Sequence, residues 1–446
     1  MCRPSQTTTN TKPNEEEEEL AKEDLWLQQF DLQGFTTEIK ALGKKLEAAQ
    51  GDADVAHLNK MILWSNSFAA VGLLTMGFGV NLLSIVCLSL YTFSRWTMIA
   101  HHTCHGGYEQ CHPHAQRRGR WSRFTFGLGS LWRRWNDWFD WMMPEAWNVE
   151  HNNRHHYHLS EIHDPDLVEQ NLVDVRNLQC PMVFKYILVV GSMLTWKWYY
   201  YSPNTYKELK LAKWRRDGKP LPKDVHPEEA VTIKSILLGQ NPFYSFLEFF
   251  WVVMGPYFVI HFFVAPLPLL LVGDYLDGYT GSGMYWSAVK NLFYADLLTN
   301  LHGFIAVVTN HAGDDMYRFR HGCRPFSGSF YLRQVLASVD FDMGTDAVDF
   351  CHGWLNYQIE HHLWPNLSML QYQKSAPLVQ EICDKYGVPY VKQNVFYRLK
   401  KTVDIMTGAT SMRWMPESYE AAFLEQDKVM MEQELAKKKT AVSSSQ

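Results

Sequence analysis

An apolar run over residues 61–100 leaves this chain few folds to adopt, because it contains a single charged side chain, an arginine. Gly77 and Gly79 divide the run into two halves of about 20 residues, the length that a helix needs to cross a bilayer core. The turn between the halves is too short and too uncharged to be a cytosolic loop. We therefore predict a membrane hairpin whose helices span about 61–78 and 80–99.

Histidine clusters occur at three places in the chain, and the first follows the hairpin directly. Imidazoles four residues apart lie on one face of a helix and can converge on one point. Imidazole suits zinc, copper, iron and nickel, so the clusters alone do not identify the metal. A zinc site is usually four-coordinate, and the clusters hold more ligands than one such ion needs, so we predict two metal ions. The predicted ligands are His101 and His105 of the first cluster, His151, His155 and His156 of the second, and Gln358, His361 and His362 of the third.

Three apolar segments separate the second cluster from the third, and the number that cross the membrane decides whether the clusters can meet. If all three crossed, the third cluster would emerge on the face opposite to the first two. Segment 182–201 contains Lys185 and Lys197 and ends in aromatic residues. This composition suits the headgroup region, so we predict an interfacial helix there. The other two segments, about 246–271 and 285–308, then form a second membrane hairpin.

Arginines indicate how this arrangement is oriented in the membrane, the net charge argues against nucleic-acid binding, and the cysteines indicate the redox compartment. Arginines are frequent just after the first cluster, and by the positive-inside rule that face is cytoplasmic, or stromal in a plastid. The net charge of −5 is small for 446 residues and argues against a nucleic-acid-binding protein. The eight cysteines form no C-x-x-C pair, which is typical of free thiols in a reducing compartment.

The order H-x-x-x-H, H-x-x-x-H-H and Q-x-x-H-H resembles the histidine boxes of the membrane fatty acid desaturase family. The sequence Q-I-E-H-H-L-W-P, which begins at Gln358, is similar to that of front-end desaturases, which insert a double bond between an existing one and the carboxyl end. Two features depart from the family's pattern. The second box has one residue more than the commoner H-x-x-H-H, and His102 stands where an Asp is usual. These departures concern the substrate and the regiochemistry more than the metal centre.

The resemblance implies a fold and a catalytic cofactor. An all-α membrane protein is expected, with about four transmembrane helices in two hairpins and a cytoplasmic helical cap that carries the histidine boxes. Family members hold two irons in such boxes and use a further histidine on the fourth spanning helix. His311 is the expected ligand there, because it lies where that helix meets the cytoplasmic face, and His302 is the alternative. Carboxylates near the boxes are expected to orient the rings, and the candidates are Glu150, Asp164, Asp166 and Glu360.

The expected activity is the O2-dependent insertion of a cis double bond into the acyl chain of an acyl-lipid or acyl-CoA substrate. Electrons must come from a donor, and no H-P-G-G haem motif of a fused cytochrome domain occurs in the sequence. We therefore expect a separate donor, cytochrome b5 or a ferredoxin. The protein is expected to be a multi-pass integral membrane protein of the endoplasmic reticulum or of a plastid.

One membrane domain is predicted between two polar ends. Residues 1–56, which include a run of glutamates, are expected to be a polar tail, disordered over 1–19 and forming an amphipathic helix over 20–50, without the pattern of a secretory signal or a transit peptide. Residues 57–395 are the predicted membrane desaturase domain. Residues 396–446 are predicted to be a charged tail.

Two other functions are compatible with parts of this pattern. A diiron hydroxylase of acyl chains or lipids would use the same boxes, and its product would gain an oxygen atom rather than lose hydrogens. A non-enzymatic metal-binding protein or transporter would place its ligands inside the spans. The histidine clusters lie outside the predicted spans. His261 and His302 are the main histidines inside the spans. We therefore predict an enzyme, and a desaturase in preference to a hydroxylase.

Overall fold

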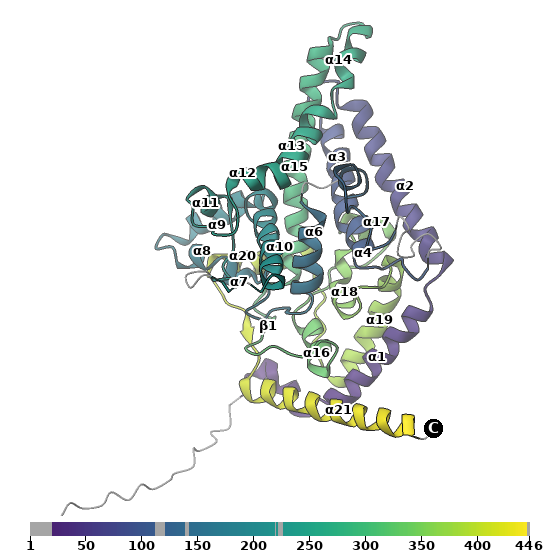
Figure 1. The fold of residues 1–446 in the computed structure, drawn as a ribbon, viewed down its shortest axis with the longest axis vertical. Helices are drawn as coiled ribbons and strands as arrows, with labels where there is room; N and C mark the ends of the chain where they lie inside the picture. The colour runs from purple at the N-terminus through teal and green to yellow at the C-terminus, as the bar shows by residue number, and fades with distance from the viewer. Residues whose placement is uncertain (1–19, 112–120, 139–141, 219, 222–225, 444–446) are drawn as a thin grey trace, which may run out of the picture.

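The computed structural model describes residues 20–111, 121–138, 142–218, 220–221 and 226–443. Within these residues the chain is mostly helical (Figure 1), which confirms the predicted helical class. Strands β1 (Tyr317–Arg318) and β2 (Arg413–Trp414) pair in parallel and form the one named sheet of the described chain. The first part of the predicted N-terminal tail, residues 1–19, lies outside the described residues.

Residues 22–48, predicted as part of a polar tail, are folded onto the domain. They form η1 (Lys22–Gln29) and α1 (Leu32–Ala48). Helix α1 packs against α16 (Gly328–Leu336) and α19 (Met369–Tyr386). Its apolar side chains recur every three or four residues, so they share one helix face and are buried. They are Leu32, Phe35, Ile39, Leu42 and Leu46.

Three helical runs are long and apolar enough to cross a membrane: Leu82–Cys104, Phe246–Tyr275 and Gly281–Asn310. They coincide with three of the four predicted spans. The remaining predicted span falls on α2 (Asp52–Thr75), which packs along the first of these runs but carries charged and amide side chains. The number of four spans and their arrangement in two hairpins stay predictions.

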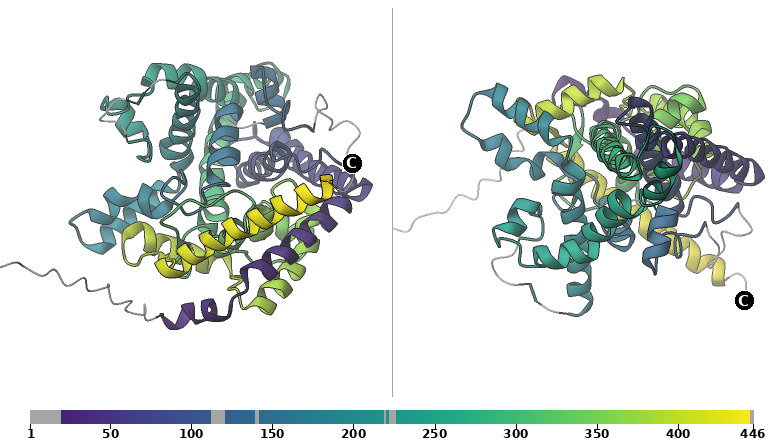
Figure 2. Two further views of the ribbon diagram at one scale, coloured as in Figure 1. Left: turned by 60° about the horizontal axis from the view of Figure 1, so that its bottom comes forward. Right: turned by 90° about the horizontal axis from the view of Figure 1, so that it is seen from above.

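The first apolar run is continuous from α3 (Leu82–Ser94) through the π-helical η2 (Arg95–Ala100) into α4 (His101–Cys104). Helix α15 (Gly281–Val307) packs against α3 and ends in the 3-10 turn η9 (Val308–Asn310). Figure 1 shows α14 at one end of the molecule, α15 running from that end into the middle, and α1, α16 and α21 at the other end. Figure 2 shows α21 lying beside α1 at this second end.

The remaining elements are the parts of the second run and the helices that pack around the three runs. Between the first two runs they are α5 (Leu131–Arg133), η3 (Arg134–Trp138), α6 (Pro144–Trp147), η4 (Asn148–His155), α7 (Val168–Asn171), α8 (Val173–Asn177), α9 (Met182–Ser192), η5 (Lys197–Tyr201), α10 (Ser202–Arg216) and α11 (Ile233–Leu237). The second run consists of α12 (Phe246–Phe249), η6 (Phe250–Met254), α13 (Gly255–Phe258), η7 (Val259–Val264), α14 (Pro268–Val272) and η8 (Gly273–Tyr275). The later helices are α17 (Asp346–Cys351), η10 (Leu355–Tyr357), α18 (Gln358–Leu363), α20 (Val395–Thr407) and α21 (Glu417–Ser443).

Helix α9 covers only the first part of the predicted interfacial segment 182–201, and it is apolar but short. One face of α9 leaves its apolar side chains exposed, namely Val183, Phe184, Ile187, Leu188 and Val190. The chain then passes through η5 into α10, whose first half is buried. An exposed apolar face on a short helix is typical of an interfacial position, and that position stays a prediction.

Candidate metal centre

Four segments that are far apart in the sequence meet below the apolar runs. The first segment is α4 together with His105, the residue that follows it. Helix α4 is the last part of the Leu82–Cys104 run, so the first histidine cluster directly continues that run. The second is η4, the third is the residue that follows η9, and the fourth is α18. Together they bring histidines into two buried groups, which we call the first and the second histidine group.

The first histidine group contains five residues whose ligand nitrogens lie within 4.8 Å of one another: His101, His105, His151, His156 and His361. The Nε2 atom of His151 is 3.0 Å from Nε2 of His101 and 3.3 Å from Nε2 of His156. Two nitrogens that bind one metal ion at about 2.1 Å and at right angles lie about 3 Å apart. The observed spacing therefore suits ligands of a common ion.

The second histidine group contains His155, His311 and His362, again with ligand nitrogens within 4.8 Å of one another. The ring centroid of His311 is 4.8 Å from that of His155 and 4.7 Å from that of His362. The Nε2 atom of Gln358 lies 2.9 Å from Nε2 of His311, so this predicted ligand stands beside the second group. The histidine expected from outside the boxes, His311, is thus brought to them.

His302, the alternative to His311, lies elsewhere on α15. Its ring stacks on Phe93 with a centroid distance of 3.7 Å. Its Nε2 atom is 2.6 Å from the carbonyl oxygen of Cys351. His302 belongs to neither histidine group, and its contacts join α15 to α3 and α17.

The second box is divided between the two groups, which differs from the expected convergence of its three imidazoles on one point. Helix η4 is π-helical, so its backbone hydrogen bonds join residues five apart. The N–H of His156 accordingly donates to the carbonyl oxygen of His151 at 3.2 Å. His151 and His156 belong to the first group, while His155 belongs to the second. The wider π-helical turn accommodates the one extra residue that this box has relative to the commoner H-x-x-H-H pattern.

Side chains from outside the boxes fix the orientation of two rings. The Nδ1 atom of His362 lies 3.1 Å from Oε1 of Gln334, and Nδ1 of His361 lies 3.3 Å from the hydroxyl oxygen of Tyr372. A partner on Nδ1 sets the tautomer and directs Nε2 toward a metal. Gln334 and Tyr372 were not predicted, because no spacing in the sequence relates them to a box.

Buried imidazole nitrogens without a hydrogen-bond partner provide a test of whether the centre suits a metal. In the two histidine groups, the unpaired nitrogens on the side opposite Nδ1 are Nε2 of His105, His361 and His362. A buried polar atom left unpaired costs about 1–3 kcal/mol. Coordination would satisfy such atoms, and a set of imidazoles suits a first-row transition metal such as iron. The residues present therefore fit a metal centre.

The protonation states also suit metal binding. Burial lowers the pKa of His361 and His362 well below the usual value, and neighbouring histidines lower it further. These rings are therefore neutral at physiological pH, which is the form that binds a metal. Burial also lowers the pKa of His155, but Asp164 and Asp166 raise it by more, so the net shift is upward.

One of the four predicted orienting carboxylates contacts a histidine closely. The Nδ1–H of His155 donates to Oδ1 of Asp164 at 2.9 Å. Backbone N–H groups of Ser160 and Asp166 donate to the same carboxylate at 2.8 and 2.9 Å, which fixes its position. The carboxylate of Asp166 is 3.9 Å from Nδ1 of His155 and lies near enough to join His151 and His155 as a ligand.

Glu150 and Glu360 are buried beside other carboxylates. Burial raises the pKa of both well above the usual value, and a neighbouring acid raises it further, Asp166 for Glu150 and Asp340 for Glu360. The hydroxyl of Tyr390 donates to Oε1 of Glu360 at 3.0 Å. Both glutamates are therefore expected to be neutral. The main groups that interact with them are the acids Asp166 and Asp340 and the phenol of Tyr390, and not imidazoles.

Replacing Asp164 by Ala is expected to lower the affinity for a transition-metal ion about 10–100-fold, because His155 loses the partner that fixes its tautomer and ring orientation. Competition with a chelator on the purified full chain measures this affinity. Asp342→Ala is the matched control, because Asp342 is exposed and its carboxylate accepts a hydrogen bond from Asn394 rather than from an imidazole. Unchanged affinity in Asp164→Ala would show that the contact has no orienting role.

A cavity of about 1570 Å³ reaches both histidine groups. Histidines line its inner end, namely His101, His151, His155 and His311. Aromatic side chains line the next part, namely Trp96, Trp147, Trp196, Tyr201 and Phe304. The cavity then continues to α9 and to residues 239–243. A largely apolar cavity with a few convergent polar groups is typical of a ligand-binding site, and this one suits a long apolar ligand.

The fold and the centre define a helical protein with apolar runs of membrane-spanning length and a buried histidine site suited to a metal. Residues 81–394 match the family described as fatty acid desaturase. The chain therefore belongs to the fatty acid desaturase family, which confirms the resemblance drawn from the three boxes.

Individual relatives are desaturases that match over shorter stretches. The chain is 26% identical over 122 residues to the sn-1 linoleoyl-lipid 6-desaturase of Arthrospira platensis, which covers 25% of this chain and 31% of the relative. It is 30% identical over 106 residues to the Delta(8)-fatty-acid desaturase 1 of Arabidopsis thaliana, with 24% and 22% covered. It is 40% identical over 75 residues to the NADPH-dependent stearoyl-CoA 9-desaturase of Mycobacterium tuberculosis, with 17% of each chain covered. The chain thus spans less than a third of the length of each of these relatives.

Proposed function

We propose that this protein is a membrane-bound, O2-dependent fatty acyl desaturase of the front-end type, which inserts a cis double bond into an acyl chain. The cavity that leads from exposed apolar helices to both histidine groups carries this proposal. Two irons are the proposed metals. The first histidine group would hold one, and the second group together with Gln358 would hold the other.

Removing hydrogen from an unactivated methylene is beyond any amino-acid side chain, and iron bound to these histidines would supply that oxidation with O2. The protein's own part is to position the acyl chain and to exclude water. Trp96 and Trp147 form the cavity wall next to His101. The ring of Trp147 stacks on His151 with a centroid distance of 4.6 Å. A methylene that lies against these indoles is therefore held beside the first histidine group, in surroundings that exclude water.

The remaining parts of the proposal concern the membrane and the electron supply. Four spans are proposed, with α2 as the first, and the packing of α2 along α3 supports this. Helix α9 is proposed to lie in the headgroup region of the endoplasmic reticulum or of a plastid membrane, which its exposed apolar face supports. A separate cytochrome b5 or ferredoxin is the proposed electron donor.

Expression in a yeast with few desaturases of its own tests the proposed reaction. Fatty acids are fed singly, and total lipids are analysed by gas chromatography and mass spectrometry. A product that lacks two hydrogens is expected, with its new bond between an existing double bond and the carboxyl end. His155→Ala is expected to abolish this product. His321→Ala is expected to leave it unchanged, because His321 is exposed and lies outside both histidine groups.

The other outcomes of this experiment are also informative. A product with an added oxygen atom would identify a hydroxylase. No product from any fatty acid, together with no iron in the purified protein, would refute the proposed function.

A further inference from the structure

The outer end of the cavity, which we call the cavity mouth, is polar and acidic. It is lined by Asp174, His226, Glu228, Glu229, Lys234, Gln240 and Asn241. Three of these side chains are carboxylates, and Lys234 carries the one lysine or arginine charge among the described residues that line the cavity. Asp174 and Glu229 are exposed, so their charges face whatever enters. The described residues that line the mouth therefore carry net negative charge.

Two basic side chains close to the cavity mouth are committed to partners inside the protein. The ammonium of Lys207 is buried and donates to the carbonyl oxygens of Pro227 and Glu229 at 2.8 and 2.9 Å. The guanidinium of Arg176 donates to the carboxylate of Glu169 at 2.8 Å. Each cation also has a carboxylate as its counter-charge, Glu208 at 3.2 Å for Lys207 and Glu169 for Arg176, so neither offsets the carboxylates of the mouth.

A coenzyme A thioester would bring a diphosphate and a ribose phosphate to the cavity mouth while its acyl chain occupied the inner end. Proteins bind phosphate with arginine forks and with lysine. Like charges that face each other disfavour a partner. A lipid headgroup without net negative charge, either an uncharged sugar or a phosphocholine, meets no such repulsion. The cation of a phosphocholine would also be attracted by the carboxylates.

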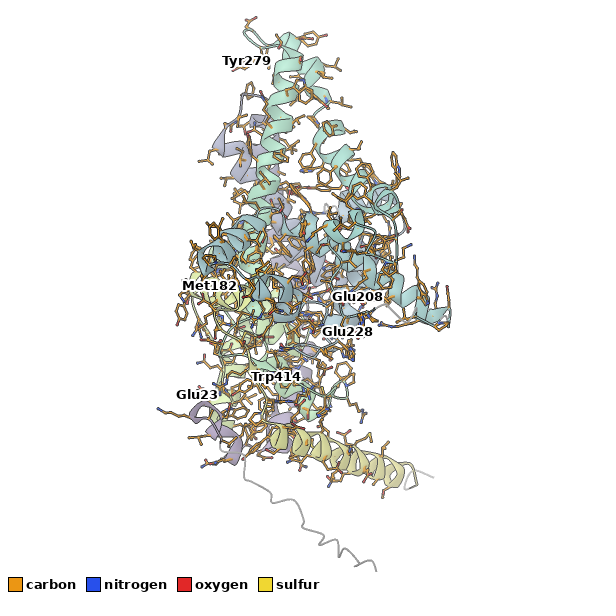
Figure 3. All side chains as sticks on the ribbon, turned by 90° about the vertical axis from the view of Figure 1, so that its left-hand side faces the viewer. Glu23, Met182, Glu208, Glu228, Tyr279 and Trp414 are labelled. Atoms are coloured by element: carbon orange, nitrogen blue, oxygen red, sulfur yellow. The ribbon has the colours of Figure 1, made fainter. Side chains whose placement is uncertain are left out.

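Exposed apolar side chains border the cavity mouth on two sides. Ile187 and Leu188 of α9 line the cavity and are 63% and 50% exposed. Leu237 and Leu238, which directly precede the lining residue Gly239, are 63% and 60% exposed. Figure 3 shows Met182, the first residue of α9, and Glu228 at a similar height, far from Tyr279 at the tip of the apolar runs. An acyl chain can thus enter sideways from a lipid layer while its headgroup stays at the mouth.

We infer that the acyl chain reaches the histidine groups while it is esterified to a membrane lipid whose headgroup has no net negative charge, and not as a coenzyme A thioester. This inference rests on the proposed desaturase function and names its substrate class. Membrane desaturases act on both kinds of carrier, as the names of the relatives show, so family membership does not decide between them.

A short labelling experiment in the same yeast tests the inference with the full chain. Labelled fatty acid is supplied briefly, and the product is measured over time in the acyl-CoA, phosphatidylcholine and phosphatidylglycerol pools. The product is expected first in phosphatidylcholine. Earliest appearance in acyl-CoA or in phosphatidylglycerol would overturn the inference while leaving the desaturase function intact. A lack of product in every pool would instead contradict the desaturase function.

Reversing the charge of the cavity mouth gives a second readout that does not depend on turnover. Binding of a fluorescent long-chain acyl-CoA to the purified full chain is measured for wild type and for the double variant Asp174→Lys, Glu229→Lys. Binding is expected to tighten at least ~10-fold in the variant at low salt and to lose this gain at high salt. Glu432→Lys, an exposed position on α21, is the matched control for added charge. Equally tight binding by wild type and the double variant would overturn the inference.

Discussion

Replacing His362 by Ala is expected to abolish product formation, with a loss of activity of at least ~100-fold. This loss exceeds the usual effect of changing a residue that only hydrogen-bonds to a metal ligand. His362 belongs to the second histidine group, which has three imidazoles where the first has five. Without His362 the second site keeps two imidazoles and Gln358, and a neutral amide is a weaker ligand for a transition metal than an imidazole. The iron content of the purified variant is expected to fall to about half of the wild-type value, because the first group keeps all its ligands.

His352→Ala is the matched control for this substitution. His352 follows α17, is partly exposed and belongs to neither histidine group, and its Nδ1 atom lies 2.9 Å from the carbonyl oxygen of Val348. Wild-type product and wild-type iron content are expected in this variant. Full activity in His362→Ala would exclude the second histidine group as a part of the reactive centre.

Replacing Asp315 by Ala is expected to destabilise the protein by about 3 kcal/mol, because it leaves the guanidinium of Arg398 buried without its counter-charge. The side chain of Arg398 is 0% exposed and donates to both carboxylate oxygens of Asp315 at 2.7 and 2.8 Å. Its other nitrogen donates to the carbonyl oxygen of Ala312 at 3.1 Å. This cluster therefore holds the loop that begins at His311, and iron in the second histidine group is expected to be lost as well.

Thermal unfolding of the detergent-solubilised full chain measures this effect, and Asp314→Ala is the matched control. Asp314 is the neighbouring residue, is 49% exposed and pairs with Lys401 at 2.9 Å. Such an exposed pair contributes less than about 1 kcal/mol. Equal unfolding temperatures for Asp315→Ala and Asp314→Ala would contradict the role of the buried pair.

The same pair gives an acid dependence. Burial raises the pKa of Asp315, but Arg398 and Lys401 lower it by more, so the net shift is below the usual 3.8. A lowered pKa stabilises the folded state above the usual value, and that contribution is lost as the pH falls through the lowered value. The difference in stability between wild type and Asp315→Ala is therefore expected to shrink in strong acid. An acid titration of both proteins at constant salt checks this sign.

The residues that meet in the two histidine groups could be chosen from the sequence because they come in short, regular clusters, and their role as metal ligands stays a prediction. Histidines four residues apart share a helix face. The family resemblance implied a further histidine on the fourth span, and the position of His311 at the cytoplasmic end of that span favoured it over His302. The structure groups His311 with the box residues and places His302 against Phe93. Family membership and the helical class were likewise predictable, because the box pattern and the apolar runs are local signals.

Other features depend on tertiary contacts that leave no local signal. Gln334 lies 28 residues from His362 in the sequence, yet its side chain contacts that ring. The π-helical turn that divides the second box was expected to be an ordinary helix. The segment that contains α1 was predicted to be an amphipathic helix within a polar tail, outside the folded domain. Its apolar face is buried only because α16 and α19 offer a complementary surface.

The unpartnered imidazole nitrogens at the centre have a consequence for the life of the protein in the cell. Each adds about 1–3 kcal/mol to the cost of the folded chain until a metal is bound, and a whole domain has a margin of only about 5–15 kcal/mol. A ligand that binds only the folded state adds its binding free energy to that margin. If iron is the metal, as proposed, a newly made chain that meets none would have a smaller margin against unfolding and would be more open to proteases. The amount of enzyme would then follow the iron supply through turnover, without any change in synthesis.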